Sequence, residues 1–276
     1  MALLDDKRFM SPLTPSGRAS LLDLATEPTQ RIAGDMMVIG FEADPEVVRK
    51  YVPEPLELDG SGLIYLRTYN AWFYSDRMQT EFVSPERSNY TETFFWIPCD
   101  YKGERYHYML YSWVNRDWLA FLGRHAGMPH KVANVQMTPF HPADPVYNGP
   151  KPGIRICTSV DCVGTVVRTY LDFKEPVPDD QPLPFRQREG YTPKYLGRRQ
   201  FYDVVSGRPI VDDLVAHWGD AMEYSTVWSG DANVTFYEHE NEEVLPFQPR
   251  RMVGGWWFTL RFDHQTSPPK IVHSYI

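Results

Sequence analysis

The sequence predicts a mostly β (α+β) protein: one closed or nearly closed β structure with a few short helices. Runs rich in β-branched and aromatic residues recur along the chain, and several of them partly alternate with polar residues. Segments with helical spacing are few and short. A chain of 276 residues with 42% hydrophobic content can bury a sizeable core. Many strands with few helices favour a single large β structure.

The first elements expected are a strand, a short helix and a longer strand. Residues 36–43 are apolar and strand-like. Asp44 can cap a helix whose first position is Pro45, where the missing N–H of proline costs nothing, and Pro53 ends that helix. Residues 62–75 are rich in Leu, Ile and aromatic side chains with partial alternation, so they predict a long strand.

A hairpin is expected next. Residues 90–99 and residues 105–114 are both strand-like, and the segment between them contains Gly103. Glycine suits a tight turn between antiparallel strands. Glu92 therefore lies in the first strand of the predicted hairpin.

A helix and an extended segment follow the hairpin. Residues 117–125 carry Trp, Leu and Phe at helical spacing, and Gly127 stands just past the helix end. Because Pro129 cannot continue a helix, the chain from His130 to residue 138 is expected to be a strand. Neighbouring side chains of a strand point to opposite faces. His130 and Lys131 are therefore not expected to face one pocket unless a bulge intervenes.

The rest of the chain predicts proline-rich loops and further strands. Residues 139–153 and 176–198 are expected to be ordered loops, and both are candidates for oligomer contacts. Residues 154–173 are β-branched and alternating, with Gly164 between two strands. The remaining strand-like runs are residues 227–238 and 255–263.

Composition indicates one domain that handles small molecules. Without an internal repeat or a long linker, residues 1–30 are interpreted as an N-terminal arm and residues 31–276 as a single domain. The net charge of -8 disfavours nucleic-acid binding, which needs clustered Lys and Arg. Three cysteines form no paired framework, which fits a reducing cytoplasm. No apolar run approaches the ~20 residues that span a bilayer, so no membrane role is expected.

Three short motifs carry the most information about function. Residues 128–132 read MPHKV, which places two ionisable side chains side by side just after a glycine-rich helix end, and Gly123-Arg124 precedes them. Residues 51–59 read YVPEPLELD, and residues 90–93 read YTET. In their order and spacing these motifs resemble the acetoacetate decarboxylase-like superfamily, over roughly residues 36–138.

The resemblance implies the family's cone-shaped β-barrel with the active site in its interior. It also implies no cofactor, a homo-oligomer, and a lysine that forms an imine with a keto acid. Aligned on Pro129, however, His130 stands at the position of the imine lysine and Lys131 at that of the family's second lysine. An imidazole can be a general acid or base near neutral pH, but it does not form a stable imine with a keto acid.

The resemblance also supplies the candidate catalytic residues. Glu92 matches the family's pocket glutamate, and its large apolar neighbours favour a protonated carboxyl that suits a general acid; an exposed strand glutamate is the alternative. His130 is expected to move protons. Lys131 is the reserve amine if the strand register shifts by one residue, and otherwise a solvated lysine at the barrel rim. The separations of the clustered histidines predict no metal site: His107, His125, His130 and His141.

Arginines and aromatic residues are the candidates for substrate binding. Arg124 can bind a substrate carboxylate or hold the helix end against the barrel. Arg67 stands in place of a family acid, so it meets an anionic substrate or is paired internally. Arg31 lies nearest to the family's substrate-binding arginine. Tyr111 and Trp113 are candidates for the wall of a cavity that accepts a substrate larger than acetoacetate.

Together these features predict a cofactor-independent lyase that acts on a small keto- or enol-type organic acid, an aromatic acid included. Decarboxylation is the leading reaction, with acid–base chemistry by Glu92 and His130. If no imine forms, the substrate must carry its own electron sink, such as a conjugated carbonyl or a para-hydroxyl on an aromatic ring. The alternatives are a hydratase, dehydratase, aldolase or cyclase on the same scaffold, and a non-catalytic protein that binds small molecules.

Overall fold

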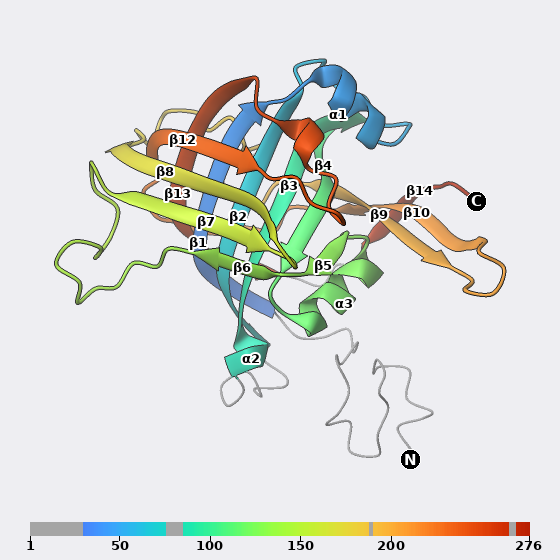
Figure 1. Ribbon diagram of the computed structural model, residues 1–276, viewed down its shortest axis with the longest axis horizontal. Coiled ribbons are helices and arrows are strands. Elements are labelled where there is room, and N and C mark those ends of the chain that lie inside the picture. Colours follow the sequence, from blue (N-terminus) through green and yellow to red (C-terminus); the bar gives the residue numbers. More distant parts are fainter. Residues whose placement is uncertain (1–29, 76–84, 188–189, 265–268) are drawn as a thin grey trace, which may run out of the picture.

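Long antiparallel strands dominate the molecule (Figure 1). The computed structural model describes residues 30–75, 85–187, 190–264 and 269–276, so the expected N-terminal arm lies outside the described residues apart from Gln30. The strands are β1 (Gln30–Glu42), β2 (Leu63–Ser75), β3 (Asn89–Tyr101), β4 (Glu104–Val114), β5 (His130–Val132), β6 (Asn134–Met137), β7 (Arg155–Asp161), β8 (Thr165–Pro176), β9 (Tyr195–Tyr202), β10 (Pro209–His217), β11 (Met222–Tyr224), β12 (Trp228–Phe236), β13 (Arg251–His264) and β14 (Lys270–Ser274).

Helices contribute little to the described residues. They are α1 (Pro45–Tyr51), α2 (Pro85–Ser88), α3 (Asp117–Ala126) and a 3₁₀ turn at Leu245–Phe247. None of them is long and apolar enough to cross a membrane.

The strands belong to one large curved sheet, which agrees with the predicted cone-like barrel. The order is β14-β10-β9-β4-β3-β2-β1-β13-β12-β8-β7-β6, with β11 beside β13 and β5 beside β4. In Figure 1 the yellow, green and orange strands β6, β7, β8 and β12 cross one face of the blue-to-green strands β1 to β4. The sheet thus folds over on itself, and its central strands are covered on that face.

Burial on both faces explains why the central strands are apolar without strict alternation. Almost every residue of β3 is buried. One face of this strand packs Phe95 and Ile97 into the core beneath β7, β8 and β12. The opposite face presents Glu92, Phe94 and Trp96 to a second apolar cluster around a cavity. A strand buried on both sides reads as a continuous apolar run, as residues 90–99 do.

Several local predictions are confirmed. The Asp44 carboxylate accepts a hydrogen bond from the Glu46 N–H over 3.0 Å, with Pro45 at the first turn of α1. The hairpin between β3 and β4 turns at Lys102 and Gly103, whose φ angles are 51° and 79°. Gly127 ends α3 with a φ of 91°, a conformation that favours glycine.

Other expectations need correction. The segment from His130 to residue 138 is two short strands that pair with different partners, β5 with β4 and β6 with β7. The loop expected over 176–198 ends in the first residues of β9. Strands β9, β10 and β14 also lie in segments for which the pattern predicted no strand, because charged residues are interspersed with their apolar ones.

Candidate active site

A cavity of about 300 Å³ lies against the inner face of β1 to β4. Its walls are mostly aromatic and apolar, and its polar groups are few, as is typical of small-molecule sites. The principal ring-bearing walls are Phe73, Phe94, Trp96, Phe185, Tyr195 and Phe258. The polar lining includes Glu92, His130, Arg67, Tyr69, Arg186, Thr192, His217 and Asp220.

Glu92 and His130 are in direct contact at the cavity wall. The Oε1 of Glu92 lies 2.9 Å from the Nε2 of His130 and accepts a hydrogen bond of 2.7 Å from the Ser112 hydroxyl. His130 is 1% exposed and Glu92 8%. The pairing of the strands produces this contact, because β5 runs parallel to β4 with His130 opposite Ser112. Two strands far apart in sequence therefore bring an acid and a base together.

The second ring nitrogen of His130 fixes where the proton sits. Its Nδ1 lies 3.0 Å from the carbonyl oxygen of Leu119 in α3. A carbonyl only accepts, so Nδ1 carries a proton and the exchangeable proton of the pair lies between Nε2 and Glu92. A single proton shared between a carboxyl and an imidazole is suited to transfer to or from a ligand in the cavity.

Opposing effects act on the pKa of His130. Burial lowers it, but the adjacent Glu92 carboxylate and the hydrogen bonds to Glu92 and Leu119 outweigh burial and raise the pKa above its ordinary value. The raised pKa favours a protonated imidazole beside the Glu92 carboxylate. The pair therefore retains its proton to a higher pH than an isolated histidine would.

The Gly123-Arg124 pair of α3 holds the histidine in place. A Cβ on Gly123 would clash with the imidazole of His130, so only glycine allows α3 to approach β5 this closely. The Nε of Arg124 donates a 2.8 Å hydrogen bond to the main-chain carbonyl of His130. Arg124 thus fixes the backbone at the site, which is the second of the two roles expected for it.

Arg67 is a buried cation in the cavity wall. It is 4% exposed, its guanidinium lies 4.0 Å from the ring centroid of Trp96, and one terminal nitrogen donates to the carbonyl of Phe185 over 2.9 Å. Its Nε has no hydrogen-bond partner, and no carboxylate forms an ion pair with it, among the described residues. Burial, opposed by Tyr65 and reinforced by Arg186, lowers the pKa of Arg67 to about 9, so the guanidinium is charged at neutral pH.

A buried guanidinium without a counter-ion is unfavourable, because charge is costly to remove from water. Such a group is expected where an anionic ligand completes the site. The indole N–H of Trp96 is likewise buried and without a hydrogen-bond partner in the described part of the chain. Arg67 and Trp96 therefore form a donor-rich end of the cavity that suits a carboxylate.

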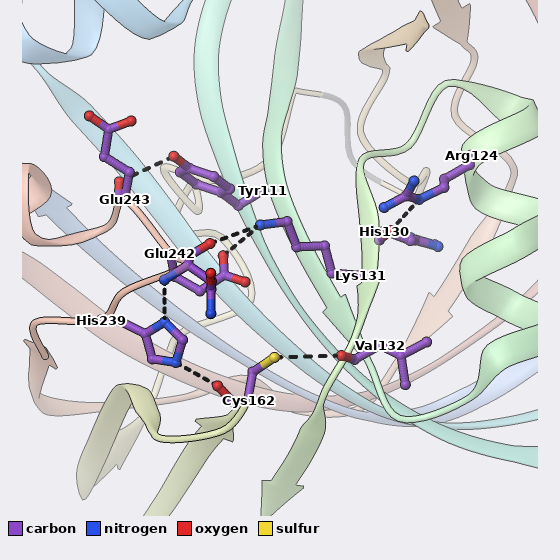
Figure 2. Close-up of polar contacts among 10 residues, drawn as sticks. Tyr111, Arg124, His130, Lys131, Val132, Cys162, His239, Glu242 and Glu243 are labelled. Carbon is purple, nitrogen blue, oxygen red and sulfur yellow. Dashed lines mark hydrogen bonds and ion pairs between the residues drawn. The ribbon is translucent and has the colours of Figure 1, made fainter. Parts of the chain in front are cut away.

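Lys131 lies on the opposite face of β5 from His130 (Figure 2). Its Nζ is 2.9 Å from a carboxylate oxygen of Glu242, whose side chain is 2% exposed. Within the described ranges, no lysine lines the cavity. The alternation expected from the sequence thus separates the two side chains, and β5 has no register shift that would turn Lys131 inward.

The remaining candidates lie outside the cavity. Trp113 is fully buried in the core on the other face of β4, and Tyr111 stacks on it with ring centroids 5.5 Å apart. The Tyr111 hydroxyl donates to the carbonyl of Glu243. Arg31 is at the exposed start of β1, with its Nε 4.0 Å from the carboxylate of Asp263.

Sequence reasoning missed two features of the site. Ser112 positions the Glu92 carboxylate, and Tyr69 lines the cavity beside Arg67. Alternation along residues 62–75 would have placed Tyr69 on the same face as Arg67, because the two are separated by two positions. In the described part of the chain, no group of three or more His, Cys, Asp or Glu residues is arranged to hold a metal ion.

The pairing of Glu92 with His130 predicts a pKa change that can be measured. In the wild type, His130 should titrate above the ordinary value of 6.5; in Glu92→Gln it should titrate below 6.5, because burial then acts without the carboxylate. NMR titration of the imidazole, assigned by its loss in His130→Asn, checks both. A His130 pKa that stays above 6.5 in Glu92→Gln contradicts the electrostatic origin of the shift.

The same pair predicts how stability depends on pH. The folded-state pKa of His130 is raised, so its interaction with Glu92 stabilises the folded protein fully when the pH is below the unfolded-state pKa of the histidine. This stabilisation is lost as the pH rises through the folded-state pKa. The difference in unfolding free energy between wild type and Glu92→Gln should therefore shrink as the pH rises from below 6.5 through the raised folded-state pKa of His130. Urea denaturation across that range measures it, and a difference that grows with pH would refute the assignment.

The close contact at Gly123 predicts an unusual response to alanine. At a solvent-exposed position inside a helix, a Gly→Ala substitution stabilises the protein by roughly 1 kcal/mol. Here the added methyl group overlaps the His130 ring, so Gly123→Ala should destabilise the protein by about 1–3 kcal/mol. A double-mutant cycle with His130→Ser is the control, since the smaller side chain leaves room for the methyl group. Equal effects of Gly123→Ala in both backgrounds would show that the ring is not what excludes a side chain.

The comparisons with known proteins agree with this architecture. The acetoacetate decarboxylase (ADC) family model matches residues 10–276. The enduracididine biosynthesis enzyme MppR, complexed with the condensation product of pyruvate and imidazole 4-carboxaldehyde, is 20% identical with a TM-score of 0.81, and the match covers 97% of each chain. An acetoacetate decarboxylase-like enzyme from Sphingomonas wittichii RW1 is 21% identical with a TM-score of 0.79, over 92% of this chain and 95% of that one.

Acetoacetate decarboxylase from Legionella pneumophila subsp. pneumophila str. Philadelphia 1 is 15% identical with a TM-score of 0.71, over 100% of this chain and 97% of that one. None of the curated proteins matches the sequence significantly. At these identities the solved structures establish the fold, while the family model spans nearly the whole chain. The chain therefore belongs to the acetoacetate decarboxylase family.

Proposed function

We propose that the protein is a cofactor-independent lyase that acts on a small keto- or enol-type organic acid, with Glu92 and His130 moving the proton. The observation that carries this proposal is the buried Glu92–His130 hydrogen bond in a cavity that is also lined by the cation Arg67. An anionic substrate bound by Arg67 would have its reacting carbon within the same small cavity as the proton-transfer pair. Decarboxylation is the leading reaction.

In this proposal the electrons released by bond breaking are accepted by the substrate itself. The cavity presents an imidazole where the resemblance places an imine lysine, and an imidazole provides no iminium to accept an electron pair. The substrate is therefore one with a carbonyl, or an equivalent group, conjugated to the breaking bond. After CO2 leaves, the proton held between Glu92 and His130 is delivered to the carbanionic carbon.

A second candidate keeps the carboxylate and moves only protons, as in an aldolase or a dehydratase. Arg67 gives it specific support, because a buried guanidinium stabilises a carboxylate before CO2 loss more than it stabilises the products afterwards. The solved structure of MppR holds a condensation product of pyruvate. Both candidates use the same proton-transfer pair and the same anion-binding end.

Turnover of a substrate panel tests the proposal and separates the two candidates. Incubation with 2-oxo acids, 3-oxo acids and hydroxylated aromatic acids should release CO2 if the protein is a decarboxylase. Exchange of α-hydrogens for deuterium in D2O without CO2 release would favour the second candidate. Ligand binding with neither reaction would leave a non-catalytic binding protein as the function.

The residue roles predict distinct kinetic effects. Glu92→Gln and His130→Gln should lower kcat by about 10²–10⁴-fold, the range for loss of general acid–base catalysis. Arg67→Gln should mainly raise KM, because it removes the anion's counter-ion. Arg155→Gln is the matched control, since this exposed arginine pairs with Asp172 away from the cavity. Unchanged kcat in both proton-transfer variants would contradict the mechanism.

The position of Lys131 predicts that no imine forms there. Lys131→Ala should retain kcat within about twofold, and borohydride treatment with keto acids should leave no reduced adduct on Lys131, because its ammonium contacts Glu242 outside the cavity. Intact mass followed by peptide mapping checks this. A reduced adduct on Lys131 that is lost together with turnover in Lys131→Ala would restore a covalent mechanism.

A further inference from the structure

We propose that Gln187 is a positioning residue for Arg67. Together with His107 it anchors the segment whose main chain holds the Arg67 guanidinium in the cavity wall. This inference rests on the proposed function, because Arg67 is there the counter-ion of the substrate. Neither Gln187 nor His107 lines the cavity, so both act on the ligand through Arg67.

Residues 184–187 form part of the cavity wall and are named the cover segment. Phe185 and Arg186 line the cavity, while Arg186 and Gln187 line an outer pocket of about 650 Å³. Phe185 is 1% exposed, and its ring stacks on that of Phe258 with centroids 5.8 Å apart. The cover segment therefore lies between the cavity and the outer pocket.

Two side chains of β2 bind main-chain carbonyls of the cover segment. The Tyr65 hydroxyl donates to the carbonyl of Pro184 over 2.8 Å, and a terminal nitrogen of Arg67 donates to the carbonyl of Phe185 over 2.9 Å. The second contact acts in both directions, because the Phe185 carbonyl fixes the guanidinium plane and with it the direction of the Arg67 Nε. That Nε has no hydrogen-bond partner among the described residues. A displaced cover segment would release the guanidinium from the orientation in which Nε can meet an anion.

Gln187 fastens the last residue of the cover segment through a closed cycle of three hydrogen bonds. The main-chain N–H of His107 donates to the carbonyl of Lys194 over 3.1 Å. The main-chain N–H of Lys194 donates to the Oε1 of Gln187 over 2.6 Å, and the Nε2 of Gln187 lies 3.0 Å from the Nδ1 of His107. The cycle joins the cover segment to β4 and to the residue that precedes β9.

The cycle also fixes the protonation state of His107. A main-chain N–H only donates, so the amide oxygen of Gln187 faces Lys194 and its amide nitrogen donates to His107. The Nδ1 of His107 is therefore unprotonated, and the neutral ring carries its proton on Nε2. Burial, followed by the charges of Arg67 and Arg105, lowers the pKa of His107 well below its ordinary value. His107 therefore adds no second positive charge beside Arg67.

His107 supports Arg67 along two routes. Its ring stacks on Trp96 with centroids 5.1 Å apart, and the Arg67 guanidinium lies 4.0 Å from the centroid of the same indole. Through Gln187 it also holds the cover segment, whose Phe185 carbonyl accepts from Arg67. An arginine oriented before the ligand arrives loses less side-chain entropy on binding, so this arrangement favours affinity for an anion.

Binding of benzoate, a carboxylate on an aromatic ring, tests the positioning role. Gln187→Ala should raise the dissociation constant about fivefold, the size expected when one long side chain must be immobilised on binding. Gln187→Met keeps the volume but lacks both amide groups, and it should have the same effect. Gln136→Ala is the matched control, because this exposed glutamine bonds to Asn134 on β6. Isothermal titration calorimetry measures the constants, and thermal melting shows that each variant is folded.

A double-mutant cycle separates this inference from the proposed function. Arg67→Gln should weaken benzoate binding, and adding Gln187→Ala to it should cause no further loss, because Gln187 acts through Arg67. If Gln187→Ala weakens binding equally in both backgrounds, or not at all in the wild type, the positioning role is overturned while the anion site stands. If Arg67→Gln binds benzoate as tightly as the wild type, the anion site of the proposed function fails, and this inference fails with it.

NMR of the His107 ring gives a readout that needs no ligand. In the wild type at neutral pH the ring nitrogens should show Nδ1 without a proton and Nε2 with one, assigned by the loss of these signals in His107→Gln. Gln187→Glu places a carboxylate oxygen beside Nδ1 and should raise the pKa of His107. A proton on Nδ1 in the wild type, or an unchanged titration in Gln187→Glu, overturns the hydrogen-bond cycle.

Kinetics on the substrate that is turned over give a further readout. Gln187→Ala should raise KM about fivefold and keep kcat within about twofold, as expected when only binding is affected. A loss of global stability alone would lower the amount of active enzyme and leave KM unchanged. A lowered kcat with an unchanged KM therefore overturns the positioning role.

Discussion

The contact between α3 and β5 is the constraint on which the candidate site depends. Three residues of α3 position His130. The Leu119 carbonyl accepts a hydrogen bond from the imidazole, and Gly123 has no side chain that would clash with the ring. The Arg124 side chain donates a hydrogen bond to the main-chain carbonyl of His130. Because α3 fixes the ring through Nδ1, the other ring nitrogen, Nε2, points toward Glu92. The acid–base pair is therefore positioned by α3, through its main chain at Leu119 and Gly123 and through the side chain of Arg124.

A single inward position determines which chemistry the scaffold can support. In β5 the inward residue is His130, and the lysine beside it pairs with Glu242 on the other side of the strand. A shift of one residue along a strand exchanges its faces, so these neighbours cannot substitute for each other without moving the strand. The resemblance in sequence around Pro129 therefore indicates the fold more reliably than the reaction.

Local signals in the sequence were sufficient for much of the fold. The cap at Asp44, the turn at Gly103, the helix end at Gly127 and the opposite orientation of His130 and Lys131 all follow from neighbours in the chain. The sequence did not reveal which face of the central strands borders the cavity. Because β3 and β4 are buried on both sides, alternation cannot say which side borders the cavity and which the second core, and Tyr111 and Trp113 lie in the latter. The contact of Ser112 with Glu92 depends on a register shift between Phe94 and Trp96 within the β3–β4 hairpin, which the sequence pattern does not specify. The position of His130 opposite Ser112 depends on the parallel pairing of β5 with β4.

The burial of Arg67 in the cavity wall lowers the stability of the folded protein. A well-packed apolar side chain in place of a buried ion often makes a protein more stable, so Arg67 is a position where the folded state is less stable than the scaffold permits. Substitutions that favour folding alone would remove this cation over time. An anion bound at Arg67, as proposed, would supply the stabilisation that the polypeptide does not.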